Sequence, residues 1–420
     1  MNKYEEIISP NEIKRLLKEN ANPSDEEIAD ILLKTRKNEI ITLRDCAVLL
    51  NASDRWNSEL FNTAKTVNEK IHHKKFRFYG VVYISDFCVN TCRYCGDNIY
   101  SKRPEWLQIE ENEDLTNKVF KTKRIMSLND FEDDVKALLS KFPEEYPLKE
   151  LCILSGDTPG LDVDRLIVYL KKLSEFYKEK IILNIPPLSV DDFKKIRRAV
   201  SKNILHFRVF QETYDPDIYK REHPPYELDN PRIKKMERFL KTYNNLTPSK
   251  MDFTYRLFAQ SRALEAGFDE VGFGVLFGLN DSEFGSKYEI MALRMHSDYI
   301  YKNYKTYPMS ISFPRVLPSK GITYRVPKEV DENELLRLVA VTRIAIPQTK
   351  LIITCRESAD FRHRIRPIIN IEDYEARPGP CGNLLPTKAV FQMEIKDRRT
   401  GREILEEVLK DGYEIVWDWG

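Results

Sequence analysis

Three cysteines, Cys88, Cys92 and Cys95, stand within eight residues of one another. Thiolates are soft ligands that suit a zinc ion or an iron–sulfur cluster. Three ligands are one fewer than a closed structural site needs, and no fourth cysteine or histidine lies nearby in the sequence. The spacing therefore predicts a metal centre with one open coordination position, where chemistry can take place.

A structural zinc site completed by a distant residue is the alternative interpretation of these cysteines. Such sites usually combine two closely spaced pairs of ligands, and this segment has no second pair. The chain has seven cysteines, an odd number that makes a poor disulfide framework. Of the other four, Cys46, Cys152 and Cys355 stand in apolar contexts typical of buried thiols, and Cys381 stands in a Pro/Gly-rich loop.

The elements that position the cysteines alternate between strands and helices. Residues 76–84 are rich in β-branched and aromatic side chains, which predicts a buried strand directly before Cys88. We expect further strands over residues 151–154, 180–185, 205–210, 270–276, 309–313 and 351–354. Alternation of this kind favours an α/β fold, most simply a (β/α) barrel of the TIM type. The catalytic groups of such barrels lie on the loops that follow the strands, which is where the three cysteines fall.

Two flanking regions complete the predicted organisation. Residues 1–75 read as a helical extension, and residues 76–369 form the predicted barrel. Residues 370–420 are expected to form a small C-terminal lobe, with a strand over 391–395 and a helix over 403–410.

Composition argues against several classes of partner. The formal net charge is +1, so no field of one sign favours nucleic acid or a membrane surface. No apolar run approaches the roughly 20 residues that span a bilayer, and the charged start does not resemble a signal peptide. We therefore expect a soluble, cytoplasmic protein with reduced thiols.

Several segments, in the same order along the chain, resemble the radical S-adenosylmethionine (SAM) aromatic amino acid lyases. This family groups 2-iminoacetate synthase, the tyrosine lyase that matures the hydrogenase H-cluster, and tryptophan lyase. The spacing C-x3-C-x2-C, with Tyr94 before the last cysteine, is the radical SAM signature. The other matching segments lie at 208–224 (RVFQETYDPDIYKREHP), 261–279, 311–319 and 353–358 (ITCRES). The resemblance covers roughly residues 10–365 and implies a radical SAM barrel. It also implies one [4Fe–4S] cluster on Cys88, Cys92 and Cys95, with SAM at the open iron.

The resemblance implies that SAM is also bound by residues after the predicted second and fourth strands and by one helix. These cofactor-binding residues are Ser155, Gly156, Asp157, Gln211, Glu212, Tyr214 and Arg262. Gln211, Glu212 and Tyr214 are expected to point towards the barrel mouth. An ordinary turn is the alternative interpretation of residues 155–157, and a solvated helix face that of Arg262.

Three further residues are predicted to act on the substrate. Arg315 ends a strand, and its guanidinium suits bidentate binding of a substrate carboxylate, with a core salt bridge as the alternative. Thr354 ends the next strand and could bind the same carboxylate. Tyr94 could orient the substrate, with aromatic packing as the alternative.

The predicted function is a radical SAM lyase that takes hydrogen from the amino group of a free aromatic amino acid and cleaves its Cα–Cβ bond. With tyrosine, the products would be dehydroglycine and p-cresol. An electron donor such as ferredoxin or flavodoxin is the expected partner, and a second cluster is not expected because the chain has no C-terminal cysteine group. Asp97 and Asp157 depart from the family pattern beside the site. The alternatives are a tryptophan lyase, a related lyase of another amino-acid-like substrate, or a non-catalytic zinc-binding barrel.

Overall fold

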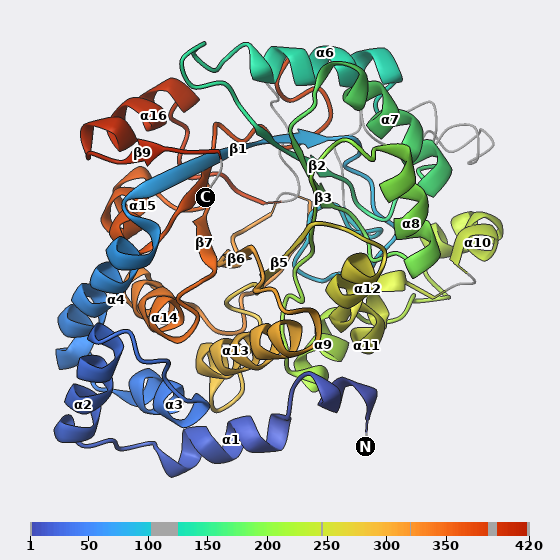
Figure 1. Ribbon diagram of the computed structural model, residues 1–420. Helices are drawn as coiled ribbons and strands as arrows, with labels where there is room; N and C mark the ends of the chain where they lie inside the picture. Colours follow the sequence, from blue (N-terminus) through green and yellow to red (C-terminus); the bar gives the residue numbers. More distant parts are fainter. Residues whose placement is uncertain (1, 102–124, 245–246, 320, 385–392, 418–420) are drawn as a thin grey trace.

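Eight parallel strands form a closed barrel in the computed structural model, which describes residues 2–101, 125–244, 247–319, 321–384 and 393–417 (Figure 1). The strands are β1 (Lys75–Tyr83), β2 (Glu150–Leu154), β3 (Lys180–Asn184), β4 (Leu205–Arg208), β5 (Glu270–Gly274), β6 (Ser310–Ser312), β7 (Lys350–Ile353) and β8 (Ile371–Asp373). Each strand pairs with the next in sequence, and β1 pairs with both β2 and β8. The predicted (β/α) barrel of the TIM type is confirmed.

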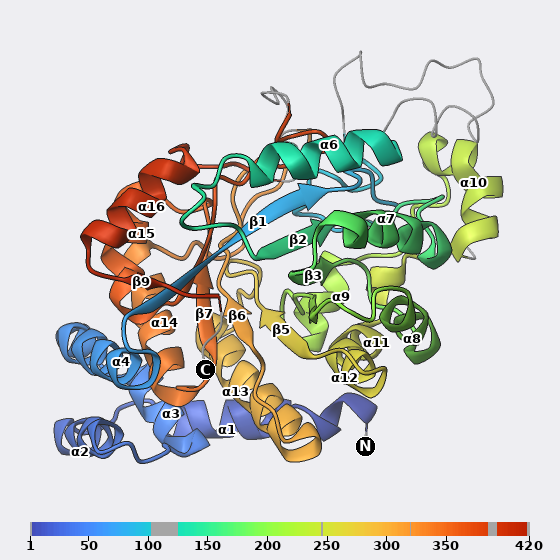
Figure 2. The ribbon, with the colours of Figure 1, turned by 45° about the horizontal axis from the view of Figure 1, so that its top comes forward.

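Helices surround the barrel (Figures 1 and 2). They are α6 (Leu128–Leu139), α7 (Val163–Phe176), α8 (Val190–Ala199), α9 (Pro216–Glu222), α10 (Pro231–Asn244), α11 (Phe253–Leu257), α12 (Ala259–Glu265), α13 (Gly285–Tyr304), α14 (Glu332–Ala345) and α15 (Ala359–Ile365). The predicted helix over 256–266 is divided at Phe258, whose ψ of 9° is not helical. Helix α13 was not predicted, because it is buried on most sides and shows no clear apolar stripe. None of the described helices is long and apolar enough to cross a membrane.

The N-terminal helices form an outer layer on the barrel's own helices. They are α1 (Pro10–Glu19), α2 (Asp25–Arg36), α3 (Leu43–Asn51) and α4 (Asn57–His72). Helices α1 and α3 pack on α13, and α4 packs on α14, as the blue helices in Figure 1 show. The extension therefore covers the outside of the barrel and contributes no residue to the cavity described below.

The predicted boundary at residue 370 is wrong. Strand β8 begins one residue later and completes the barrel, and β9 (Glu414–Ile415) pairs with the first residues of β1. Helix α16 (Gly401–Lys410) lies between them in sequence. Two residues of the predicted strand over 391–395 lie outside the described residues, and the other three form no strand. Strand β8 was missed because it is only three residues long and its sequence, Ile-Glu-Asp, contains no apolar run.

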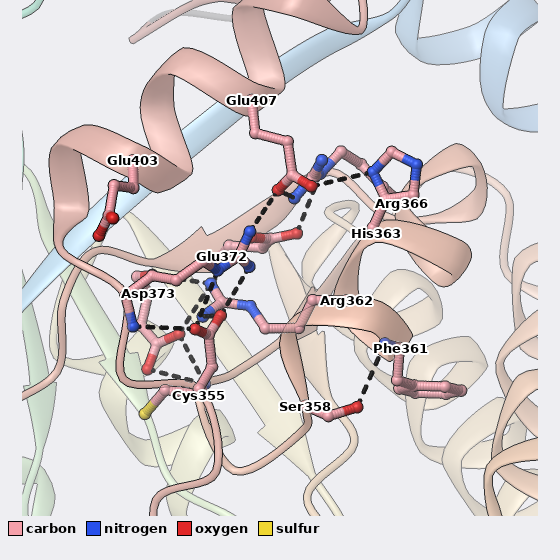
Figure 3. A network of polar contacts seen from close by, with 12 residues as sticks. Cys355, Ser358, Phe361, Arg362, His363, Arg366, Glu372, Asp373, Glu403 and Glu407 are labelled. Atoms are coloured by element: carbon pink, nitrogen blue, oxygen red, sulfur yellow. Dashed lines mark hydrogen bonds and ion pairs between the residues drawn. The ribbon is translucent and has the colours of Figure 1, made fainter.

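Buried charge pairs explain how such a polar strand lies inside the fold (Figure 3). Arg362 of α15 is fully buried and contacts Glu372 and Asp397, each at 2.8 Å. Arg366 contacts Glu372 at 3.3 Å and Glu407 of α16 at 2.9 Å. Because a buried charge is tolerated only when it is paired, these contacts join β8 to α15 and α16.

Candidate active site

A cavity opens where the barrel strands end, and the three cysteines line it. It encloses about 1460 Å³, including its open mouth. Its walls come from the loop after β1 and from residues at the carboxyl ends of the other strands, as expected for a barrel of this type. The predicted site residues that line it are Cys88, Cys92, Tyr94, Cys95, Ser155, Gly156, Asp157, Glu212 and Thr354.

Hydrogen bonds hold the cysteine loop against the end of β2. The backbone N–H of Asp157 donates to Cys88 Sγ at 3.3 Å, and Asn90 Nδ2 donates to the same sulfur at 3.5 Å. The backbone N–H of Cys95 donates to the carbonyl of Cys92 at 3.2 Å. Hydrogen bonds to ligand sulfur tune the potential of an iron–sulfur cluster, so Asn90 and Asp157 stand where they could do this.

The three thiols fit a cluster better than a single ion. Within the described residues, no three cysteine, histidine or acidic side chains are close enough together to hold one metal ion. In a [4Fe–4S] cluster each thiolate binds a different iron, so its ligands stand further apart. Burial raises the pKa of Cys88 to about 12, and burial followed by the Asp97 carboxylate raises that of Cys95. Bound cationic iron would reverse this and keep the sulfurs deprotonated.

Gly156 leaves room for the cysteine loop. A Cβ atom at this position would lie 2.7 Å from Cys88 Cβ and 2.8 Å from the carbonyl oxygen of Phe87. We expect Gly156→Ala to displace Cys88 and to lower the iron content of the reconstituted protein several-fold, because neither contact can be relieved by a flexible side-chain end. Iron analysis beside a thermal melt checks this. Full iron content in the variant would contradict the role of Gly156.

Ser249 and Lys250 line the cavity beside Asp157. The Asp157 carboxylate accepts hydrogen bonds from Ser249 Oγ at 2.6 Å and from Asn90 Nδ2 at 3.4 Å. The backbone N–H of Lys250 donates to Asn90 Oδ1 at 2.9 Å. Burial raises the pKa of Asp157, and these bonds oppose the shift. The short helix η4 (Ser249–Met251) thus anchors both the cysteine loop and the predicted SAM-binding turn.

Glu212 is held at the cavity wall by two cations. Its carboxylate contacts Lys250 Nζ at 2.6 Å and Arg256 Nη2 at 3.4 Å. Burial by itself would raise its pKa, but these two neighbours more than offset burial and hold the pKa below its usual range. Its φ of 72° lies in the left-handed region, which is uncommon outside glycine and concentrates at functional sites. Glu212 therefore presents an ionised carboxylate at a defined position.

Tyr94 and Thr354 follow β1 and β7, respectively, and line the same cavity at the carboxyl end of the barrel. His223 Nδ1 donates to the carbonyl of Tyr219 at 2.8 Å, which leaves its Nε2 to accept from the Tyr94 hydroxyl at 2.8 Å. Burial, and then the charge of Lys250, keep the pKa of His223 well below its usual value, so the imidazole is neutral. Tyr94 is thus fixed in orientation, and Thr354 follows β7 at the barrel mouth.

Arg315 does not line the cavity, and its guanidinium is held in the core, away from the place predicted for a substrate carboxylate. Its Nε donates to Glu357 at 2.9 Å, its Nη2 contacts the other oxygen of Glu357, and its Nη1 donates to the carbonyl of Val330 at 2.8 Å. This is the core salt bridge that was the alternative. Arg356, which was not among the predicted site residues, lines the cavity instead.

Gln211 and Tyr214 also point away from the cavity. The Tyr214 hydroxyl contacts His296 Nδ1 of α13 at 2.9 Å, and the side chain is buried in the core outside the barrel. Gln211 Nε2 donates to the carbonyl of Phe253 at 3.5 Å. Neither lines the cavity, so of this predicted trio only Glu212 does. Neighbouring side chains of a strand face opposite ways, which separates Gln211 from Glu212, whereas Tyr214 lies in the bend that leads into α9.

Arg262 is not part of the cavity either. Its Nε donates to the carbonyl of Leu188 at 2.8 Å, and its guanidinium lies 3.8 Å from the centre of the Tyr255 ring. It therefore joins α12 to the segment before α8 on the outside of the barrel, away from the cavity where SAM is predicted to bind.

The cavity contains polar residues that sequence reasoning missed. They are Asn90, Asn184, Arg208, Ser249, Lys250, Arg256, Arg356 and Asp373. Arg208 and Arg356 fall inside the segments quoted for the family resemblance, RVFQETY and ITCRES. A charged residue within or directly after a buried strand was the signal that could have revealed them.

Known proteins resemble this chain in both sequence and fold. A family model described as the Biotin and Thiamin Synthesis associated domain matches residues 312–414. 2-Iminoacetate synthase of Escherichia coli (strain K12) is 23% identical over 376 residues, covering 89% of this chain and 86% of that enzyme. HydG, a maturase of the [FeFe]-hydrogenase, is 26% identical, with a TM-score of 0.79 over 99% of this chain and 81% of its own. Methylornithine synthase (PylB), at 17% identity and a TM-score of 0.63 over 92% of this chain and 97% of its own, shares the fold.

Proposed function

We propose that this chain, which belongs to the radical SAM aromatic amino acid lyase family, cleaves the Cα–Cβ bond of free tyrosine to dehydroglycine and p-cresol. The observation that carries the proposal is one cavity, lined by the three cysteines, by Glu212 and by Thr354. A 2-iminoacetate synthase and the maturase HydG are its relatives at 23% and 26% identity, which supports the reaction class.

Cys88, Cys92 and Cys95 would hold a single [4Fe–4S] cluster, and SAM bound at its open iron supplies a 5′-deoxyadenosyl radical that removes hydrogen from the substrate. The remaining cysteines have other surroundings. Cys46 is buried in α3, Cys152 accepts a hydrogen bond from Arg208, and Cys381 packs beside Met126.

Different cavity residues would bind SAM and the substrate. The Asp157 and Glu212 carboxylates are placed to accept hydrogen bonds from SAM at the ends of β2 and β4. Arg356 and Thr354 would hold the substrate carboxylate, because within the described residues the Arg356 guanidinium makes one long hydrogen bond, at 3.5 Å to the carbonyl of Arg315. Tyr94 would orient the substrate ring.

We also propose a reduced ferredoxin or flavodoxin as the electron donor and the cytoplasm as the compartment. Free thiols at all seven cysteines support a reducing environment.

Anaerobic incubation of the reconstituted protein with SAM, a reductant and one amino acid at a time tests the proposal. We expect about four iron and four sulfide per chain, and 5′-deoxyadenosine and p-cresol formed together with tyrosine. If tryptophan or another amino acid raises 5′-deoxyadenosine while tyrosine leaves it at background, the tyrosine assignment fails. Zinc bound in place of a reducible cluster would contradict the proposal that the protein is a radical SAM enzyme.

A further inference from the structure

Arg208 lies deep in the cavity, on the inner face of β4. Three residues separate it from Glu212, which follows the end of the strand towards the mouth. Its side chain is buried and lines the cavity. A guanidinium therefore stands at the floor of the proposed active site, well below the residues assigned to SAM and to the substrate carboxylate.

Two glycines of β5 make space for this floor. A Cβ at Gly272 would lie 3.0 Å from Arg208 Cγ and 2.6 Å from His206 Nε2, and a Cβ at Gly274 would lie 2.2 Å from the Phe210 ring. Larger residues at these positions would collide with the inward side chains of the neighbouring strand. The barrel is thus built to admit a long charged side chain at position 208.

No carboxylate pairs with Arg208 in the described part of the chain. Its Nη2 donates to Cys152 Sγ at 3.4 Å, and its guanidinium lies 4.3 Å from the centre of the Tyr79 ring. Its Nε is buried without a hydrogen bond, and its Nη1 makes none within the described residues. Among the described residues, the contacts of the guanidinium are therefore a thiol and an aromatic face.

Two acidic groups in the surroundings of Arg208, Glu150 and the cavity residue Asp373, are already paired with other cations. Glu150 contacts Arg77 and lies 2.9 Å from Lys180. Asp373, which also lines the floor, accepts the backbone N–H of Cys355 at 2.9 Å and contacts Arg362 at 3.3 Å. A buried charge without a counter-charge is destabilising, so its retention in a cavity points to a ligand.

We infer that Arg208 binds the far end of the substrate side chain, and that this end carries an oxygen that accepts hydrogen bonds, as a phenol does. The inference rests on the proposed function and deepens it. A guanidinium has donors and no acceptor, so it matches a hydroxyl or carboxylate oxygen. The indole N–H of tryptophan is itself only a donor, and phenylalanine offers neither group.

The walls between mouth and floor suit an aromatic ring. Val81, Leu154, Phe210 and Leu276 line the cavity with apolar surface. A substrate held by its carboxylate at Arg356 would therefore place its ring among these side chains and its terminal oxygen towards Arg208. The chemical class that fits is an amino acid with an aromatic side chain ending in an oxygen acceptor.

Binding to the reconstituted holoenzyme with SAM but without reductant tests the inference apart from turnover. Calorimetry would compare tyrosine, phenylalanine, tryptophan and 4-carboxyphenylalanine on the wild type, Arg208→Gln, Arg208→Lys and the control Arg197→Gln. Arg197 contacts Asp269 outside the cavity. We expect the wild type to prefer tyrosine to phenylalanine by about 100-fold, and Arg208→Gln to lose this preference. Phenylalanine affinity should change little, and lysine should restore part of the preference.

The outcomes separate the inference from the proposed function. Preference for 4-carboxyphenylalanine over tyrosine, lost in Arg208→Gln, would support Arg208 while removing the tyrosine assignment. Unchanged preference in Arg208→Gln, or a wild type that binds phenylalanine or tryptophan as tightly as tyrosine, would overturn the inference. The wild-type comparison needs no variant, so it decides the matter even if Arg208→Gln does not fold.

Discussion

Cys92→Ala is expected to yield a folded protein that holds no reducible [4Fe–4S] cluster and forms 5′-deoxyadenosine only at the background rate. Cys92 lines the cavity with the two other cysteines, and a cluster left with two protein thiolates has lost a third of its protein ligands. The substitution removes a side chain from the cavity wall and leaves the barrel core intact. Iron and sulfide analysis, electron paramagnetic resonance after reduction, and 5′-deoxyadenosine formation measure the effect.

Cys46→Ala is the matched control for this experiment. Cys46 is a buried thiol in α3, within the N-terminal layer that contributes nothing to the cavity. We expect it to keep full iron content and activity, at a modest loss of stability from the small space it leaves. A Cys92→Ala protein with a wild-type cluster signal would show that the cluster is held elsewhere.

Arg362→Met is expected to lower the free energy of unfolding by about 3–5 kcal/mol, because it removes one side of a buried charge network. Arg362 is fully buried, and its loss removes the paired cation of the Asp373 carboxylate and deprives Glu372 and Asp397 of one partner each. Strand β8 then loses its principal contact with the segment before α16. Urea unfolding of the apo-protein measures the change.

Arg364→Met on the same helix provides the control. Arg364 is half exposed and contacts Glu332 at 3.2 Å, so its loss should change the free energy of unfolding by no more than about 0.5 kcal/mol. Equal effects from the two substitutions would mean that the network around Arg362 contributes nothing beyond a surface ion pair.

Local patterns in the sequence were sufficient for the barrel and the cysteine loop. Strands β1 to β7 contain or adjoin buried apolar residues, so their positions could be predicted without knowledge of any contact. The three cysteines lie within eight residues, so their grouping and their place after β1 follow from the chain itself. Glu212 and Thr354 were found because strand ends point to the mouth of such a barrel.

Tertiary structure alone decided which charged side chains face the cavity. Arg315 and Arg356 both follow barrel strands, yet Glu357 binds the first and leaves the second at the cavity wall. Strand β8 was missed because its buried charges are stabilised by partners far away in the sequence, such as Arg362. The floor residue Arg208 was missed because no local pattern reveals that its side chain lines a cavity. The sequence by itself determined where the cysteines stand. Long-range pairing of charges decided what surrounds them, since an ion pair depends on proximity in space and leaves no periodic trace along the chain.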